Sequence, residues 1–400
     1  MESQHRIGRT LLFTCLASIL GFGLQAGICT VQGQVIDWPK VRQLYRGGLQ
    51  RQTPADRAKE YLERVDQERH QKRLQRSRSQ SRLDRRAASA AKGKETTGLI
   101  PLTELGESNY KGQTGGLYGK GGNMPPAAHL TAAKKELAKI EPLDADGKPS
   151  AGGKIVLISL GMSNTTQEFS KFKELTDVDA DKSPNLVIVD CAQGGMAAQQ
   201  WAHPESRMRK KRRPPWITMA ERVQKAGVSP AQVQVVWIKQ AQPMPARLGE
   251  FPKHAKSIQR DVTIILNKLK EKFANLRVAY LSSRIYAGYA TTGLNPEPYA
   301  YESAFAVRWL IEEQIKGKPE LNYDSARGEV KSPLLLWGPY LWADGVKPRK
   351  GDNLVWKRED FRRDGTHPSE SGRKKVADML LKFFKNHPTA KRWFLKRSAI

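Results

Sequence analysis

The sequence predicts an α/β fold in which a mainly parallel sheet lies between two layers of helices. Apolar segments of strand length alternate with amphipathic segments of helix length from residue 154 to residue 386. The predicted strands are apolar throughout, which is typical of parallel strands that are buried on both faces. We therefore expect a three-layer α/β/α sandwich, with functional residues gathered at the carboxyl ends of its strands.

Each predicted strand ends in a polar or glycine-containing segment. The four clearest strands are 155–160, 185–190, 233–238 and 277–282. A further apolar segment, 333–337, is either a fifth strand or an insertion near the site. The predicted helices cover residues 127–140, 165–175, 196–201, 258–273, 301–316 and 371–386. This order places the segments after the strands along one rim of the sheet.

Two motifs bring reactive side chains to this rim. Gly161-Met162-Ser163 follows the first strand directly, so the strand delivers a serine hydroxyl to the edge of the sheet. Near the other end of the chain, Asp364-Gly-Thr-His367 places a carboxylate and an imidazole in one turn. A serine hydroxyl is a poor nucleophile until a base takes its proton, and a carboxylate can orient that base. The motifs predict Ser163 as nucleophile, His367 as base and Asp364 as its partner.

Residues 152–386 resemble the SGNH (GDSL-type) hydrolases, a family of esterases and lipases with a flavodoxin-like three-layer fold. The resemblance rests on four blocks in the family's order: Gly161-Met162-Ser163, Gly194-Gly195, Gln240-Ala241-Gln242-Pro243 and Asp364-Gly-Thr-His367-Pro368. Met162 departs from the family's aspartate, and Gln242 stands where the family has asparagine. The resemblance implies a mainly parallel sheet of five strands, and an oxyanion hole formed by the amides of Ser163 and Gly195 and the side chain of Gln242.

Several residues outside the motifs are weaker candidates. Those for substrate contact are Tyr118, Asn123, His129 and Tyr286, with His203 as a spare histidine. A glycine-rich loop wrapped on the core is the alternative for the first three. Cys191 could serve as a thiol nucleophile, but the preceding Asp190 would raise its pKa, and burial at a strand end is commoner. We expect neither a cofactor nor a metal, because the glycine-rich segment lacks the order of a phosphate-binding loop and 144–147 lacks the full ligand set of a calcium loop.

The first 33 residues predict an export signal. Arg6 and Arg9 precede a short apolar run, 11–20, which falls short of the roughly 20 residues that a membrane span needs. We expect cleavage and a periplasmic or secreted protein without a transmembrane span, with an uncleaved anchor as the alternative. Cleavage would remove Cys15 and Cys29, so a disulfide within the exported chain is not expected.

Three further regions are predicted after the signal. They are a basic, largely disordered or helical linker (34–95), a glycine- and proline-rich wrapping segment (96–150) and the hydrolase domain (151–400). The chain carries a formal net charge of +28, with 17 basic and 8 acidic residues between 35 and 95. A field of this sign favours anionic partners such as acidic polysaccharide, and we expect the basic run 207–213 to be a solvated loop or a site for an anionic glycan. Nucleic acid is a less favoured partner, because export is expected and the linker lacks interleaved aromatic residues.

The leading hypothesis is an exported serine esterase that removes acyl groups, with acetylated carbohydrate as the expected substrate. The carbohydrate part rests on the resemblance and on an aromatic-rich C-terminal half with Tyr286, Tyr299, Trp337, Tyr340 and Trp342. The alternative is a non-catalytic protein that binds acidic glycan or cell wall on the same scaffold, which Met162 and Gln242 would favour. A nucleic-acid-binding envelope protein is a third hypothesis.

Overall fold

The chain divides into two compact units, residues 1–85 and 86–400. The computed structural model describes residues 30–31, 34–35, 67–68, 71, 93–205 and 213–396. Within the first unit, β1 (Thr30–Val31) and β2 (Gln34–Val35) form an antiparallel pair. The predicted export signal, the predicted linker and the basic run fall almost entirely outside the described residues.

A five-stranded parallel sheet forms the centre of the second unit. Its strands are β5 (Ile155–Gly161), β6 (Leu186–Val189), β7 (Val233–Lys239), β8 (Val278–Ser282) and β9 (Leu334–Trp337). They lie in the order β6-β5-β7-β8-β9, and every pairing is parallel. The residues of β5, β7, β8 and β9 are all buried, which confirms the predicted parallel sheet covered on both faces. The uncertain segment 333–337 is therefore a strand, at one edge of the sheet.

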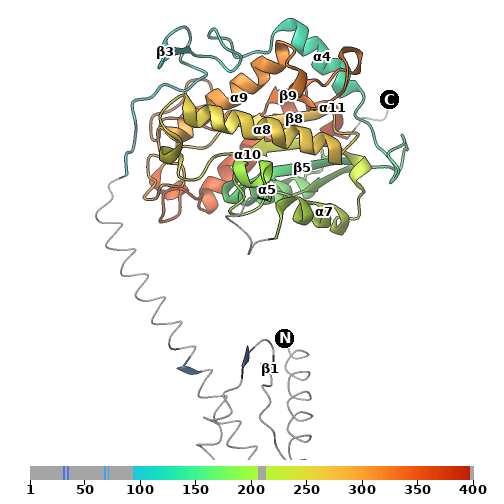
Figure 1. The fold of residues 1–400 in the computed structure, drawn as a ribbon, viewed down its shortest axis with the longest axis horizontal. Coiled ribbons are helices and arrows are strands. Elements are labelled where there is room, and N and C mark those ends of the chain that lie inside the picture. Colours follow the sequence, from blue (N-terminus) through green and yellow to red (C-terminus); the bar gives the residue numbers. More distant parts are fainter. Residues whose placement is uncertain are drawn as a thin grey trace, which may run out of the picture. The chain divides into compact units, whose positions relative to one another are not determined.

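Helices cover both faces of the sheet (Figure 1). They are α4 (Ala127–Ala138), α5 (Ser163–Asp177), α6 (Ala198–Ala202), α7 (Pro215–Lys225), α8 (Lys253–Lys272), α9 (Tyr299–Ile315), α10 (Glu370–Asn386) and α11 (Lys391–Phe394). On one side α5 packs against α10, and on the other α8 packs between α6 and α9. Short 3-10 turns complete the unit: η2 (Pro230–Gln232), η3 (Pro245–Leu248), η4 (Pro319–Leu321), η5 (Ser325–Arg327) and η6 (Arg358–Asp360).

The segment that precedes the sheet is held on the domain by hydrogen bonds and by packing in the core. It contains the short antiparallel pair β3 (Asn109–Tyr110) and β4 (Gln113–Thr114). The hydroxyl of Tyr110 donates to Glu302 on α9 at 2.7 Å, and the amide of Leu102 donates to the Tyr340 hydroxyl at 3.1 Å. Leu102 also belongs to the same hydrophobic core as the sheet. This segment therefore packs against α9 and against the loop after β9.

The strand register places three loops side by side at the carboxyl rim of the sheet. Gly161 at the end of β5 pairs with Lys239 at the end of β7, which in turn pairs with Ser282 at the end of β8. The turn into α5, the loop 240–252 and the loop 283–298 therefore begin next to one another. No helix in the described part of the chain is long and apolar enough to cross a membrane.

Candidate active site

Ser163 lies at the amino terminus of α5, directly after the first strand of the sheet. Gly161 makes this sharp turn possible, because a Cβ there would collide with Thr165 Oγ1 and with the carbonyl of Lys239. The side chain of Thr165 donates to that carbonyl at 2.8 Å and so ties α5 to β7. As the first residue of a 15-residue helix, Ser163 stands where the helix dipole is positive. Negative charge that develops beside its amide is therefore stabilised.

The structure brings Ser163, His367 and Asp364 into one hydrogen-bonded relay. Ser163 Oγ lies 2.8 Å from Nε2 of His367, and Nδ1 of His367 lies 2.5 Å from Oδ2 of Asp364. Oδ1 of Asp364 accepts from the amides of Thr366 and His367, each at 3.0 Å. The side chains of His367 and Asp364 are 22% and 31% exposed, so a substrate can reach them.

The charge of Asp364 decides where the proton of the imidazole lies. Burial raises the pKa of this carboxyl, but hydrogen bonds from the side chain and amide of His367 and from the amide of Thr366 outweigh it and lower the pKa to about 2. At neutral pH Asp364 is thus a carboxylate, which can only accept hydrogen bonds. The proton of a neutral His367 must therefore be on Nδ1, which leaves Nε2 free to accept the hydroxyl proton of Ser163.

The turn that holds His367 is fixed from three sides. The buried side chain of Asn164 donates to the carbonyl of Thr366 at 2.9 Å, which links the residue after Ser163 to the residue before His367. From the loop 283–298, the amide of Thr291 donates to the carbonyl of Asp364 at 3.0 Å. Arg358 on η6 donates to three successive carbonyls that precede Asp364. These contacts determine the distance between Ser163 and the imidazole.

The glycine pair 194–195, predicted to contribute an amide to an oxyanion hole, follows β6 close to the serine. A Cβ built on Gly194 would lie 4.0 Å from Cβ of Ser163, and Gly195 has a positive φ of 76° that suits glycine. The role of the Gly195 amide in an oxyanion hole stays a prediction. The buried amide of Gln242 has other partners: its Nε2 donates to Asp261 and its Oε1 accepts from the amide of Gln199 at 3.3 Å. A role of Gln242 in the oxyanion hole would use its second N–H and stays a prediction.

The four residues predicted to contact substrate form hydrogen bonds with other residues of the protein. The hydroxyl of Tyr118 lies 3.5 Å from the amide of Trp337, and burial raises its pKa to about 12. Asn123 donates to the carbonyl of Thr103, the buried His129 contacts that of Leu335, and Tyr286 donates to that of Lys94. The bonds of Tyr118, His129 and Tyr286 hold the segment 93–138 on the domain, whereas that of Asn123 lies within the segment. Substrate binding by the four residues stays a prediction that these contacts do not favour.

The aromatic residues behind the carbohydrate hypothesis are mostly core residues. Trp337, Tyr340 and Trp342 are each at most 5% exposed, and Tyr286 is fully buried. Trp342 packs edge-to-face against Tyr301 inside the molecule, with ring centroids 4.9 Å apart. Their number therefore reflects core packing and does not support a sugar-binding platform.

The remaining sequence candidates have other surroundings. Cys191 is fully buried, and this burial together with Asp190 raises the pKa of its thiol, so the thiol stays protonated and unreactive. His203 is 41% exposed and lies 3.7 Å from Asp261. Within the described ranges no group of three or more histidine, cysteine, aspartate or glutamate side chains could hold a metal ion.

Sequence reasoning missed a buried ion pair below the rim. Lys239, the last residue of β7, binds Glu168 of α5, and both side chains are fully buried. Burial raises the pKa of Glu168 and lowers that of Lys239 to about 8. The signal that could have found this pair is the lysine that directly follows six buried strand residues, since a buried lysine needs a carboxylate partner.

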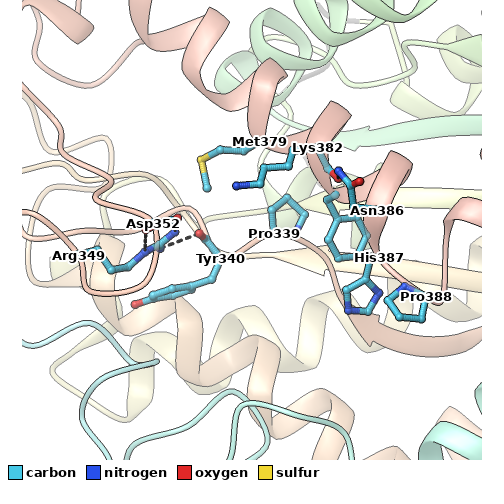
Figure 2. A pocket seen from close by; sticks show the side chains of 10 residues that line it. Pro339, Tyr340, Arg349, Asp352, Met379, Lys382, Asn386, His387 and Pro388 are labelled. Carbon is cyan, nitrogen blue, oxygen red and sulfur yellow. Dashed lines mark hydrogen bonds and ion pairs between the residues drawn. The ribbon is translucent and has the colours of Figure 1, made fainter. Parts of the chain in front are cut away.

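A surface cavity of about 400 Å³ lies apart from these residues. Figure 2 shows it between the segment after β9 and the carboxyl end of α10, with Arg349 bonded to Asp352 and to the carbonyl of Tyr340. Lys382, Asn386 and His387 line the α10 side. None of the lining residues belongs to the Ser163 or Asp364 motif, so this cavity is distinct from the triad.

Comparison with known proteins gives distant structural likenesses. No family model and no curated protein sequence matches the chain. A Bacteroides fragilis protein described as a candidate acylhydrolase is 13% identical with a TM-score of 0.33, over 65% of this chain and 96% of its own. The protein YxiM of Bacillus subtilis is 12% identical with a TM-score of 0.30, over 60% of this chain and 57% of its own. At these values the likenesses carry no argument about activity, so the chemistry is argued from the site alone.

Proposed function

We propose that this chain is a divergent hydrolase of the SGNH type that cleaves carboxylic esters through an acyl-enzyme on Ser163. The observation that carries the proposal is the relay in which Ser163, His367 and Asp364 are joined by contacts of 2.8 Å and 2.5 Å. Residues more than two hundred positions apart in the chain form it, at the rim where α/β enzymes place their chemistry.

The first half of the reaction forms the acyl-enzyme. Nε2 of His367 takes the proton of Ser163 Oγ as this oxygen attacks the ester carbonyl carbon. The carbonyl oxygen becomes an oxyanion, which the amides of Ser163 and Gly195 would stabilise; losing one such donor typically costs about 3 kcal/mol of barrier. As the tetrahedral intermediate collapses, the bond to the leaving alcohol breaks, and His367 returns the proton to that alcohol.

The second half repeats these steps with water. His367 takes a proton from a water molecule that attacks the acyl carbonyl, and the Ser163 ester bond then breaks as the proton returns to Oγ. The carboxylate of Asp364 stabilises the imidazolium that forms twice in each cycle. The products are a carboxylic acid, an alcohol and the unchanged enzyme.

We also propose that the protein is exported and that its substrate is a carbohydrate ester. Arg6, Arg9 and the apolar run after them support cleavage of an export signal and action outside the cytoplasm. Sequencing the amino terminus of the mature protein tests this directly. Acylated, anionic carbohydrate is the substrate class suggested by the family resemblance and the basic charge.

The activity is tested with p-nitrophenyl acetate and a fluorophosphonate probe. We expect hydrolysis, and covalent labelling of Ser163 alone, and we expect Ser163→Ala to lose both. Ser325→Ala, which removes an exposed serine from η5, is the control and should keep both. A parent protein that is neither labelled nor active, yet binds acidic polysaccharide in low salt, would contradict the proposal and favour the non-catalytic alternative.

A further inference from the structure

Exposed apolar side chains gather in the two loops beside the triad. Among the described residues, eight large apolar side chains are exposed. Three of them, Met244, Leu248 and Leu294, are 40%, 40% and 44% exposed and lie in the loops that follow β7 and β8. We refer to these three residues as the apolar rim patch.

The two loops that carry the apolar rim patch are bonded to each other. The amide of Met244 donates to the carbonyl of Gly293 at 3.0 Å, and the side chain of Asn295 lies 3.5 Å from the carbonyl of Gln242. A Cβ at Gly293 would lie 2.8 Å from Sδ of Met244, so the thioether lies directly over this glycine. Met244 and the loop that carries Leu294 therefore form one surface, and Leu248 ends the 3-10 turn that follows Met244.

The apolar rim patch also adjoins the catalytic turn. Thr291, two residues before Gly293, donates its amide to the carbonyl of Asp364 at 3.0 Å. On the other side, β7 is the neighbour of β5, so the loop with Met244 begins next to the turn that presents Ser163. The two loops of the apolar rim patch therefore flank the turns that carry Ser163 and Asp364.

Met244 has an unusual backbone for its residue type. Its φ of 51° and ψ of 50° lie in the left-handed region, which side chains other than glycine, asparagine and aspartate rarely adopt. Such conformations persist where surrounding structure enforces them, and they cluster at ligand sites. Methionine also adapts its shape to apolar ligands, since its side chain is unbranched and polarizable.

We propose that the apolar rim patch binds the acyl chain of the ester, so that the preferred substrate carries an acyl group several carbons longer than acetyl. This inference rests on the proposed esterase function. Three side chains are too few for a stable protein partner, which needs about 800 Å² on each side. An acyl chain attached to the carbonyl at Ser163 needs only a narrow apolar surface, and this one lies in the two loops that adjoin the turn with Asp364 and His367.

The chain-length dependence of kcat/KM tests the inference. Each methylene that leaves water contributes about 0.8 kcal/mol, which converts to about a fourfold gain in kcat/KM. We expect kcat/KM to rise at least about tenfold from p-nitrophenyl acetate to the octanoate. In the Leu248→Ser/Leu294→Ser double variant, and in Met244→Asn, which keeps a residue that tolerates the left-handed region, this octanoate-to-acetate ratio should fall about tenfold.

Val178→Ser is the matched control. Val178 is 83% exposed at the opposite end of α5, about 22 Å from Ser163 along the helix, so its loss should leave the ratio unchanged. Fluorophosphonate labelling of Ser163 in each variant checks that the site has folded. A parent enzyme that hydrolyses acetate through Ser163 but prefers it to octanoate overturns the acyl-chain inference and leaves the esterase proposal standing. An unchanged ratio in the patch variants also overturns it, and the absence of any hydrolysis or labelling overturns both.

Discussion

Replacing Asn164 by aspartate tests how Ser163 and His367 are held together. Asn164 is 1% exposed, and its Nδ2 donates to the carbonyl of Thr366 at 2.9 Å. Aspartate has the same shape but no donor, so a carboxylate oxygen would face a carbonyl oxygen. The two groups repel each other, and the catalytic turn should move away from α5.

The size of the effect follows from burial and geometry. Leaving a buried carbonyl without its donor costs about 1–3 kcal/mol of unfolding free energy. A displacement of His367 by about 1 Å reduces the rate about a hundredfold, because proton transfer from Ser163 Oγ depends on the contact that now measures 2.8 Å. We therefore expect kcat to fall about a hundredfold while KM changes little.

Kinetics and urea unfolding of two variants separate positioning from stability. Asn267→Asp is the control, since Nδ2 of Asn267 donates to the carbonyls of Glu320 and Lys331 at 2.7 Å and 2.9 Å, away from the triad. It should lose stability but keep kcat. The reasoning is refuted if Asn164→Asp is destabilised and its kcat stays within about twofold of the parent value.

Three further predictions concern the turn, its carboxylate and the buried thiol. Gly365→Ala should lower the unfolding free energy, measured in urea, by more than about 3 kcal/mol, because φ is +61° and the new Cβ would collide with the carbonyl of Tyr289. The control Gly351→Ala, at φ +87° but with open space around the new Cβ, should lower it by only about 1 kcal/mol. The pKa of Asp364 is lowered from 3.8 to about 2, so its contribution to stability should be complete above about pH 4 and lost as the pH falls through about 2. The difference in unfolding free energy between the parent and Asp364→Asn should therefore shrink over that range. A constant difference would contradict the pKa shift. The thiol of Cys191 should resist labelling by a maleimide in the folded protein and react fully in denaturant, because it is buried. Fast labelling without denaturant would contradict this burial.

The periodicity of apolar residues in the sequence was sufficient to predict the sheet and most of the helices that cover it. The apolar segment 155–160 predicted β5 to within one residue, because a parallel strand buried on both faces leaves no position for polar residues. The segment 333–337 stayed ambiguous, since a short apolar run also suits a buried loop until its pairing with β8 is known. The helix α7 (Pro215–Lys225) was not predicted, because the cationic run before it suggested a loop.

The three side chains of the Ser163–His367–Asp364 relay could be inferred from the sequence, but the contacts that hold them could not. The spacing of Asp364 and His367 within one turn predicts that the carboxylate contacts the imidazole. The bonds from Asn164 and Thr291 to that turn join distant segments, and no local pattern encodes them. Likewise, an exposed Met244 looks like any loop residue until its backbone conformation and its bond to Gly293 are known.

The most direct measurement of the central claim is mass spectrometry of the protein quenched in acid during turnover of p-nitrophenyl acetate. The account predicts the mass of one acetyl group on the peptide that contains Ser163, present in the parent and absent from Ser163→Ala. Turnover in the parent without this modification, or with the acyl group on another residue, would contradict it.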